Sequence, residues 1–197
     1  MLAEHTNELY PIFLKVNRLN VLIIGGGNVA HEKLHFLLKS SPNAQVEIVS
    51  EDFLPDIEDL AQKHQVELIK RPFNPLYIRN KHIVIAATNK LNVNIDIYNH
   101  CKQMGVLVNV ADNPKYCDFY LGGIVTKGHV KIAISTNGKS PTMAKRLRQF
   151  FEEVIPSDIN QLVEQLHLIR KQVKGDFKLK VDTLNQITQT IITKTND

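Results

Sequence analysis

Three glycines near the start of the chain have the spacing of a nucleotide-binding turn. Residues 25–30 (Gly-Gly-Gly-Asn-Val-Ala) match the pattern Gly-x-Gly-x-x-Ala between an apolar segment and a helical pattern. We expect Gly25 to allow a tight turn and Gly27 to let the backbone approach a pyrophosphate closely. Asn28 and Val29 then lie at a helix N-terminus, whose unpaired N–H groups bind phosphate. The alternative is a turn that packs a helix without binding any ligand.

Acidic residues follow the second apolar segment and bear on the choice of cofactor. Ser50, Glu51 and Asp52 come directly after an expected strand at residues 45–49, and the next basic residue along the chain is Lys63. In this kind of site an acidic residue binds the ribose hydroxyl of NAD, whereas the ribose phosphate of NADP needs Arg or Lys. The sequence therefore favours NAD. The alternative is that the acidic pair caps the next helix.

Small and polar residues end the fourth apolar segment. Ala86 and Ala87 leave room for a nicotinamide ribose, and Thr88 and Asn89 follow them. Because ligands bind at the carboxyl ends of the strands in this fold, we expect Thr88 and Asn89 to contact the cofactor. The alternative is a plain turn in which Asn89 caps the following helix.

A carboxylate follows the fifth apolar segment. Asp112 lies in residues 109–114 (Asn-Val-Ala-Asp-Asn-Pro). Beside a nicotinamide, it is placed to take a proton while a hydride leaves the substrate, and such a base needs burial or neighbours that raise its pKa. The alternative is a turn in which Asp112 bonds its own backbone. The 8 histidines form no metal-ligand spacing, so we expect no metal site.

These candidate residues belong to a regular alternation of short apolar segments and helical patterns. The alternation predicts an α/β fold with a Rossmann-type, doubly wound parallel sheet. Helices are expected after the glycine turn and at residues 56–64 and 91–104. The expected strands are residues 20–24, 45–49, 66–70, 83–87 and 106–110.

The pattern changes after Asp112. Residues 119–125 and 130–135 predict a β-hairpin, and Pro141 suits the first position of a helix at residues 141–153. The remaining chain has a helical pattern too narrow for a core of its own. We therefore expect these helices to pack on the hairpin or on a second copy of the chain, as a homodimer.

Three regions follow from these patterns. We expect residues 1–113 to form an NAD-binding domain and residues 151–197 to form a C-terminal helical region. Residues 114–150 would form a hairpin and helix that serve dimerisation and wall the active site.

The composition is that of a globular protein. Of the 197 residues, 43% are hydrophobic and 22% are charged. No apolar stretch approaches the roughly 20 residues that cross a bilayer, and the first residues do not resemble a signal peptide. With only 2 cysteines, a disulfide framework is not expected, and we predict a cytoplasmic protein without a membrane partner. The net charge of +4 suits an anionic ligand, but no nucleic-acid motif is present, so no nucleic-acid partner is expected.

Several motifs, in order, resemble those of precorrin-2 dehydrogenases, a family that includes the amino-terminal module of siroheme synthases. The resemblance covers roughly residues 9–156. It rests on residues 11–13, residues 25–30 with Lys33, and residues 86–89, 109–114, 117–119, 132–136 and 138–141. It implies NAD-dependent oxidation of precorrin-2 to sirohydrochlorin, and some members also insert ferrous iron. Asp112 matches the aspartate usually proposed as acid/base.

The implied substrate carries carboxylates around its rim. Lys139 and Ser140, with the free N–H groups at the start of the helix at residues 141–153, form an expected carboxylate cradle. Asn113 is a further expected substrate contact. The alternative is that Ser140 and Pro141 only start the helix.

The chain departs from the family's pattern at two places. Glu32 stands where Arg is common, and Gly122-Gly123 stands where a Pro-Ala pair is common. The glycine pair lies in the expected hairpin and bears on substrate fit and metal handling. A different class of function is a non-enzymatic sensor that binds NAD(H) tightly without turnover, which would leave Asp112 and the hairpin without a role.

Overall fold

The computed structural model describes residues 7–172 and 177–192 of the chain, which divides into two compact units. The first unit comprises residues 1–122 with residues 135–141, and the second comprises residues 123–134 with residues 142–197. The three expected regions divide the chain at other positions, and their separate roles stay predictions. Parts of the expected terminal regions, namely residues 1–6, 173–176 and 193–197, lie outside the described residues.

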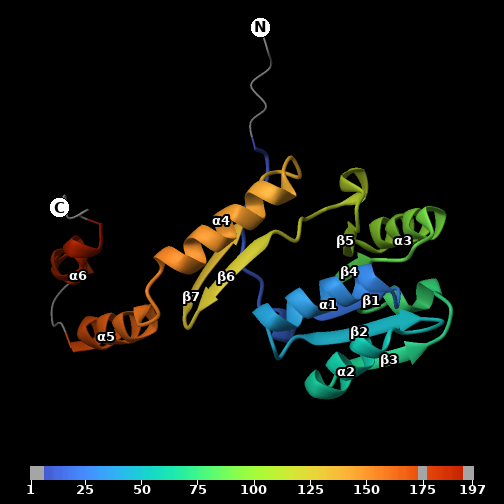
Figure 1. Ribbon diagram of the computed structural model, residues 1–197, viewed down its shortest axis with the longest axis horizontal. Helices are drawn as coiled ribbons and strands as arrows, with labels where there is room; N and C mark the ends of the chain where they lie inside the picture. Colours follow the sequence, from blue (N-terminus) through green and yellow to red (C-terminus); the bar gives the residue numbers. More distant parts are fainter. Residues whose placement is uncertain (1–6, 173–176, 193–197) are drawn as a thin grey trace, which may run out of the picture. The chain divides into compact units, whose positions relative to one another are not determined.

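The first unit is built on a parallel sheet whose order is β3-β2-β1-β4-β5 (Figure 1). The order turns back between β1 and β4, which is the switch point where ligands bind in doubly wound folds. The expected strands are confirmed with small shifts at their ends. They are β1 (Asn20–Ile24), β2 (Gln45–Ser50), β3 (Glu67–Lys70), β4 (Ile83–Ala86) and β5 (Leu107–Val110).

Helices cover both faces of this sheet. On one face, α1 (Asn28–Ser40) and α2 (Pro55–His64) pack against a cluster of buried strand residues. On the other face, α3 (Leu91–Met104) and the 3-10 helix η2 (Pro75–Ile78) pack against a second cluster. The doubly wound arrangement is therefore confirmed. Two further 3-10 helices are η1 (Val16–Arg18) and η3 (Pro114–Tyr116).

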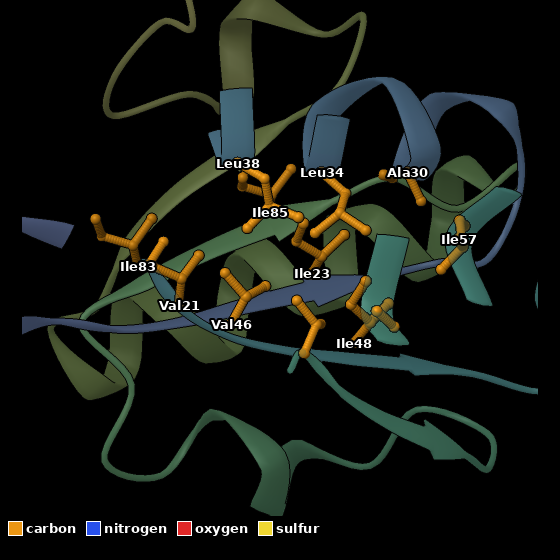
Figure 2. Packing of buried hydrophobic residues seen from close by; sticks show 14 residues of the cluster. Val21, Ile23, Ala30, Leu34, Leu38, Val46, Ile48, Ile57, Ile83 and Ile85 are labelled. Atoms are coloured by element: carbon orange, nitrogen blue, oxygen red, sulfur yellow. The ribbon is translucent and has the colours of Figure 1, made fainter. Parts of the chain in front are cut away.

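The sheet stays in place because both of its faces are apolar. In β1, Val21 and Ile23 belong to the cluster under α1, whereas Leu22 and Ile24 belong to the cluster under α3. Figure 2 shows Val21 and Ile23 beside the α1 residues Leu34 and Leu38. Burying each such side chain contributes about 1.5–3 kcal/mol, so the sheet is a rigid base for the loops at its edge.

The second unit contains a hairpin and the later helices. Strands β6 (Gly123–Lys127) and β7 (Val130–Ile134) pair antiparallel around Gly128, which has a φ of +56°. The expected hairpin is confirmed, but its first strand begins at residue 123 rather than 119. The reason is that the Phe119 carbonyl accepts a hydrogen bond from Asn109 Nδ2 of β5, which ties residue 119 to the first unit.

Three helices complete the second unit: α4 (Pro141–Val154), α5 (Ile159–Gln172) and α6 (Phe177–Ile192). At the hairpin turn, the His129 N–H donates to Asn160 Oδ1 at 2.8 Å, and Lys127 Nζ donates to the Ile155 carbonyl. The start of α5 thus packs on the hairpin, as expected. Among the described residues, no helix is long and apolar enough to cross a bilayer.

Candidate nucleotide-binding and active site

Gly25 forms the tight turn that follows β1. Its φ is +130°, and a Cβ at this position would lie 2.4 Å from the Ala87 carbonyl oxygen. Its N–H donates to the Val49 carbonyl at 2.9 Å, which links the turn to β2. Only glycine combines this backbone conformation with this close contact, so the expected role of Gly25 has a physical reason.

Gly26, to which the sequence analysis gave no role, is the most tightly enclosed residue of the turn. A Cβ here would lie 1.8 Å from the Asp52 carbonyl oxygen and 2.7 Å from Ser50 Oγ. The Leu54 N–H also donates to the Gly26 carbonyl at 3.0 Å. The loop after β2 therefore lies directly on the glycine turn, which only the fold could reveal.

Gly27 has the opposite surroundings. A Cβ built on Gly27 would meet no heavy atom of the described chain within 4 Å. The residue is the N-cap of α1, and no side chain caps that helix end. Protein packing therefore does not require a glycine here, and the contact of Gly27 with a pyrophosphate stays a prediction. The N–H groups at Asn28 and Val29, in the first turn of α1, suit a pyrophosphate.

The acidic residues after β2 do not cap the next helix. The N-cap of α2 is Leu54, which makes no side-chain cap, so the capping alternative for Glu51 and Asp52 is wrong. Asp52 Oδ1 instead lies 3.0 Å from Lys70 Nζ at the end of β3. Ser50 and Lys70 are partners in the parallel register. Lys70 was not predictable as a neighbour of Asp52, because the strand register and not the distance along the chain brings it there.

The loop after β4 is held by a side chain of α3. Asn94, which is only 5% exposed, accepts hydrogen bonds from the Thr88 N–H and hydroxyl and donates to the Thr88 carbonyl. The N-cap of α3 is Lys90 without a side-chain cap, so the alternative in which Asn89 caps the helix is wrong. The Thr88 hydroxyl lies 2.7 Å from Asn94 Oδ1 and 3.2 Å from the Lys90 carbonyl oxygen, and cofactor contacts of Thr88 and Asn89 stay predictions. A polar residue within an apolar helical stripe was the available sequence signal.

Asp112 lies just beyond β5 with a φ of +58°. The neighbouring Ala111 N–H donates to the Ala86 carbonyl at 2.9 Å, so the loop starts beside the end of β4. The Asp112 side chain is exposed, and within the described residues it has no hydrogen bond or ion pair. The alternative in which it bonds its own backbone is therefore wrong. The burial expected for a general base is therefore not found at Asp112 within the described part of the chain.

The thiol of Cys117 holds the loop that carries Asp112 through hydrogen bonds to its backbone. Cys117 Sγ donates to the Val110 carbonyl at 3.2 Å and to the Asn113 carbonyl at 3.3 Å, on either side of Asp112. Asn109 Nδ2 contacts Cys117 Sγ at 3.4 Å and the Phe119 carbonyl at 2.8 Å. Burial raises the pKa of Cys117, which keeps the thiol protonated as a donor. This role of Cys117 depends on contacts that only the folded loop creates, and the motif at residues 117–119 was its sequence signal.

The expected substrate residues Lys139 and Ser140 lie in the segment at residues 135–141, which clusters with the first unit. Thr136 closes this segment, because its hydroxyl donates to the Ser140 carbonyl at 3.0 Å and accepts from the Ser140 N–H at 3.2 Å. Helix α4 begins at Pro141, as expected. The alternative is therefore correct in one respect, because Ser140 and Pro141 do lie at the start of this helix. Substrate contacts of Lys139, Ser140 and Asn113 stay predictions.

The parallel sheet brings four of the predicted segments to one edge. The glycine turn follows β1, Ser50 ends β2, Thr88 follows β4 and Asp112 follows β5. Because these strands are parallel, their carboxyl ends meet at the same side of the sheet. Among the described residues, no group of three or more His, Cys, Asp or Glu side chains could hold a metal ion.

A glycine turn at the switch point of a parallel sheet defines a dinucleotide-binding protein of the Rossmann class. The family described as putative NAD(P)-binding matches residues 12–123, and the family described as sirohaem biosynthesis protein central matches residues 127–153. The chain belongs to this putative NAD(P)-binding family, and the match of residues 127–153 to the sirohaem biosynthesis family supports the resemblance found in the motifs.

Curated relatives and a solved structure agree with this assignment. Siroheme synthase 1 of Yersinia pestis (strain Pestoides F) is 32% identical over 89% of this chain and 37% of its own length. Siroheme synthase of Pseudoalteromonas translucida (strain TAC 125) is 36% identical over 87% of this chain and 36% of its own. The chain thus spans about a third of the length of these relatives.

The fold is also that of a solved structure described as SirC, precorrin-2 dehydrogenase. The two match with a TM-score of 0.70 and 22% sequence identity over 91% of this chain and 89% of the other. The likeness extends over both the sheet and the later helices, which confirms the expected fold class.

Proposed function

We propose that the chain oxidises precorrin-2 to sirohydrochlorin and passes the hydride to NAD. The observation that carries this proposal is that the glycine turn, with its open Gly27, and the exposed carboxylate of Asp112 lie at the same edge of one sheet. A hydride acceptor and a carboxylate base are the two groups that such an oxidation needs. The siroheme synthase relatives support the choice of a tetrapyrrole.

Bound NAD supplies the hydride acceptor. The first turn of α1 holds its pyrophosphate through backbone N–H groups, with the ribose hydroxyls at Glu51 and Asp52. Asp112 takes the proton that the ring loses, so one precorrin-2 and one NAD⁺ give sirohydrochlorin, NADH and one proton. Lys139, Ser140 and Asn113 bind carboxylates at the rim of the substrate.

The exposure of Asp112 is consistent with a large macrocyclic substrate. A macrocycle bound over the loop after β5 would cover the carboxylate and exclude water from it. The hydrogen bonds of Cys117 hold the backbone on both sides of Asp112, so the backbone at Asp112 keeps its place before the substrate arrives. Ferrous iron insertion is a second reaction for the same residue, because it also requires a base that takes pyrrole protons.

A homodimer completes the proposal. Helix α4 exposes an apolar face with a spacing of three and four residues, and a second copy would cover this face. Its members are Met143 (53% exposed), Leu147 (37%), Phe150 (55%) and Val154 (56%). A sharply monomeric mass in light scattering, unchanged in a Phe150→Glu variant, would contradict the dimer.

The proposal also includes a cytoplasmic location and no nucleic-acid partner. Cys101 and Cys117 are both free thiols, which is consistent with a reducing compartment. Binding to DNA of random sequence that weakens steeply with salt would contradict the second point.

The first experiment is an anaerobic assay of the purified chain with precorrin-2 and NAD. Sirohydrochlorin and NADH are followed by absorbance, and we expect them to appear in equal amounts. Addition of Fe²⁺ after the oxidation then tests iron insertion. Tight NADH binding without any turnover would refute the dehydrogenase and favour the redox sensor.

A further inference from the structure

A cation and an anion lie together at the end of β2. Lys70, the last residue of β3, is the register partner of Ser50, the last residue of β2. Its Nζ lies 3.0 Å from Asp52 Oδ1. In this fold, the end of β2 is where the adenosine ribose of a dinucleotide binds. This position therefore contains Lys70 as well as the acidic residues that follow β2.

The backbone of Asp52, one partner of this ion pair, is fixed next to the glycine turn. A Cβ on Gly26 would lie 1.8 Å from the Asp52 carbonyl oxygen, so the chain at residue 52 is in contact with the turn. The Leu54 N–H donates to the Gly26 carbonyl at 3.0 Å, which holds the same loop from its other end. The backbone at Asp52 therefore cannot move away from the turn unless this loop moves.

The side chains themselves are free to exchange partners. The Lys70 side chain is 69% exposed and the Asp52 side chain is 87% exposed, and exposed ion pairs are held weakly. A ribose that arrives between them can separate the pair at little cost. The carboxylate accepts a hydrogen bond from a hydroxyl, and the ammonium group binds a phosphate as a point charge.

We propose that Asp52 and Lys70 together read the 2′ position of the adenosine ribose, and that the chain consequently binds NADP(H) as well as NAD(H). Asp52 accepts the 2′-hydroxyl of NAD(H), and Lys70 binds the 2′-phosphate of NADP(H) once it leaves Asp52. Glu51 adds a second negative charge beside this position, so NAD(H) remains the preferred partner. This inference rests on the proposed nicotinamide site and adds the residue that sets its selectivity.

The test is a fluorescence titration of the full chain with NADH and with NADPH, which requires no precorrin-2. We expect Lys70→Glu to weaken NADPH binding at least about fivefold and to change NADH binding by less than about twofold. Asp52→Asn should shift the ratio of the two affinities in the opposite direction, toward NADPH. The matched control is Lys63→Glu, the same charge change on an exposed residue in the last turn of α2.

The outcomes separate this inference from the proposed function. If the wild-type chain binds NADH but no NADPH, or if Lys70→Glu changes the affinity ratio no more than Lys63→Glu does, the role of Lys70 is refuted. If the wild-type chain binds neither nucleotide, the nicotinamide site fails and the inference fails with it. Circular dichroism melting of each variant, compared with wild type, confirms that the measured chains are folded.

Discussion

Gly26 and Asp52 are in backbone contact, so close that a Cβ on Gly26 would lie 1.8 Å from the Asp52 carbonyl oxygen. This contact joins the turn after β1 to the loop after β2. One of these segments binds phosphate in the proposed site, and the other reads the ribose. Their separation is therefore set by packing of the protein itself, before any ligand binds.

The contact predicts that Gly26→Ala destabilises the fold. The new methyl group would have to displace backbone atoms, and such overpacking costs about 1–3 kcal/mol of the free energy of unfolding. Urea denaturation, followed by circular dichroism, measures this loss. A variant as stable as wild type would show that the loop after β2 moves away from the turn without cost.

Gly27→Val should behave in the opposite way. The position is open on the side where a Cβ would project, and the Gly27 φ of −96° is accessible to any residue, so stability should change by less than about 0.5 kcal/mol. The side chain would instead block the approach of a pyrophosphate, and NADH binding should fall below detection. Titration by fluorescence measures the affinity, and unchanged binding would place the cofactor elsewhere.

Asp112→Asn tests the proposed base. The amide keeps the size of the side chain but cannot take a proton, so oxidation of precorrin-2 should slow by about 10²- to 10⁴-fold. NADH binding should stay within about twofold of wild type. Asp59→Asn, at an exposed position on α2, is the control and should keep full activity. Normal turnover of Asp112→Asn would mean that the proton leaves to water or to another residue.

Asn94→Ala tests the support of the loop after β4. The substitution removes the Asn94 partner of the Thr88 N–H and carbonyl groups, and an unsatisfied buried polar group costs about 1–3 kcal/mol. We expect a lower free energy of unfolding together with weaker NADH binding. Asn99→Ala, on the exposed side of the same helix, should change neither. A loss of stability with unchanged affinity would limit Asn94 to a role in folding.

Cys101 predicts a stability change at alkaline pH. Burial, with a smaller contribution from Asp118, raises the pKa of this thiol from 9.0 to about 12. Because the folded chain holds the proton more tightly than the unfolded chain, the stabilisation is complete below pH 9 and is lost as the pH rises toward 12. Wild type should lose up to about 1.4 kcal/mol per pH unit more than Cys101→Ala in this range. Urea denaturation at several pH values measures the two slopes, and equal slopes would contradict the assignment.

Local patterns predicted the elements of this chain well. Strand β4 is a short apolar run that is buried at all four positions, so its burial on both faces was visible as continuous hydrophobicity. The glycine turn was also predictable, since its spacing and flanking elements are local. The hairpin was predicted with a first strand that began too early, because Phe119 is used by Asn109 of β5 instead of by the hairpin.

The sequence by itself determined the alternation of strands and helices, the glycine turn and the family, because all of these depend on residues that are close along the chain. The tertiary structure alone decided which distant residues meet. It placed Lys70 beside Asp52, and the backbone of Asp52 against Gly26. It also placed Asn94 within hydrogen-bond distance of Thr88, and Cys117 within hydrogen-bond distance of the backbone before and after Asp112. The physical reason is that parallel strands bring their carboxyl ends together whatever their separation in sequence, and the register of each strand pair then selects the neighbours.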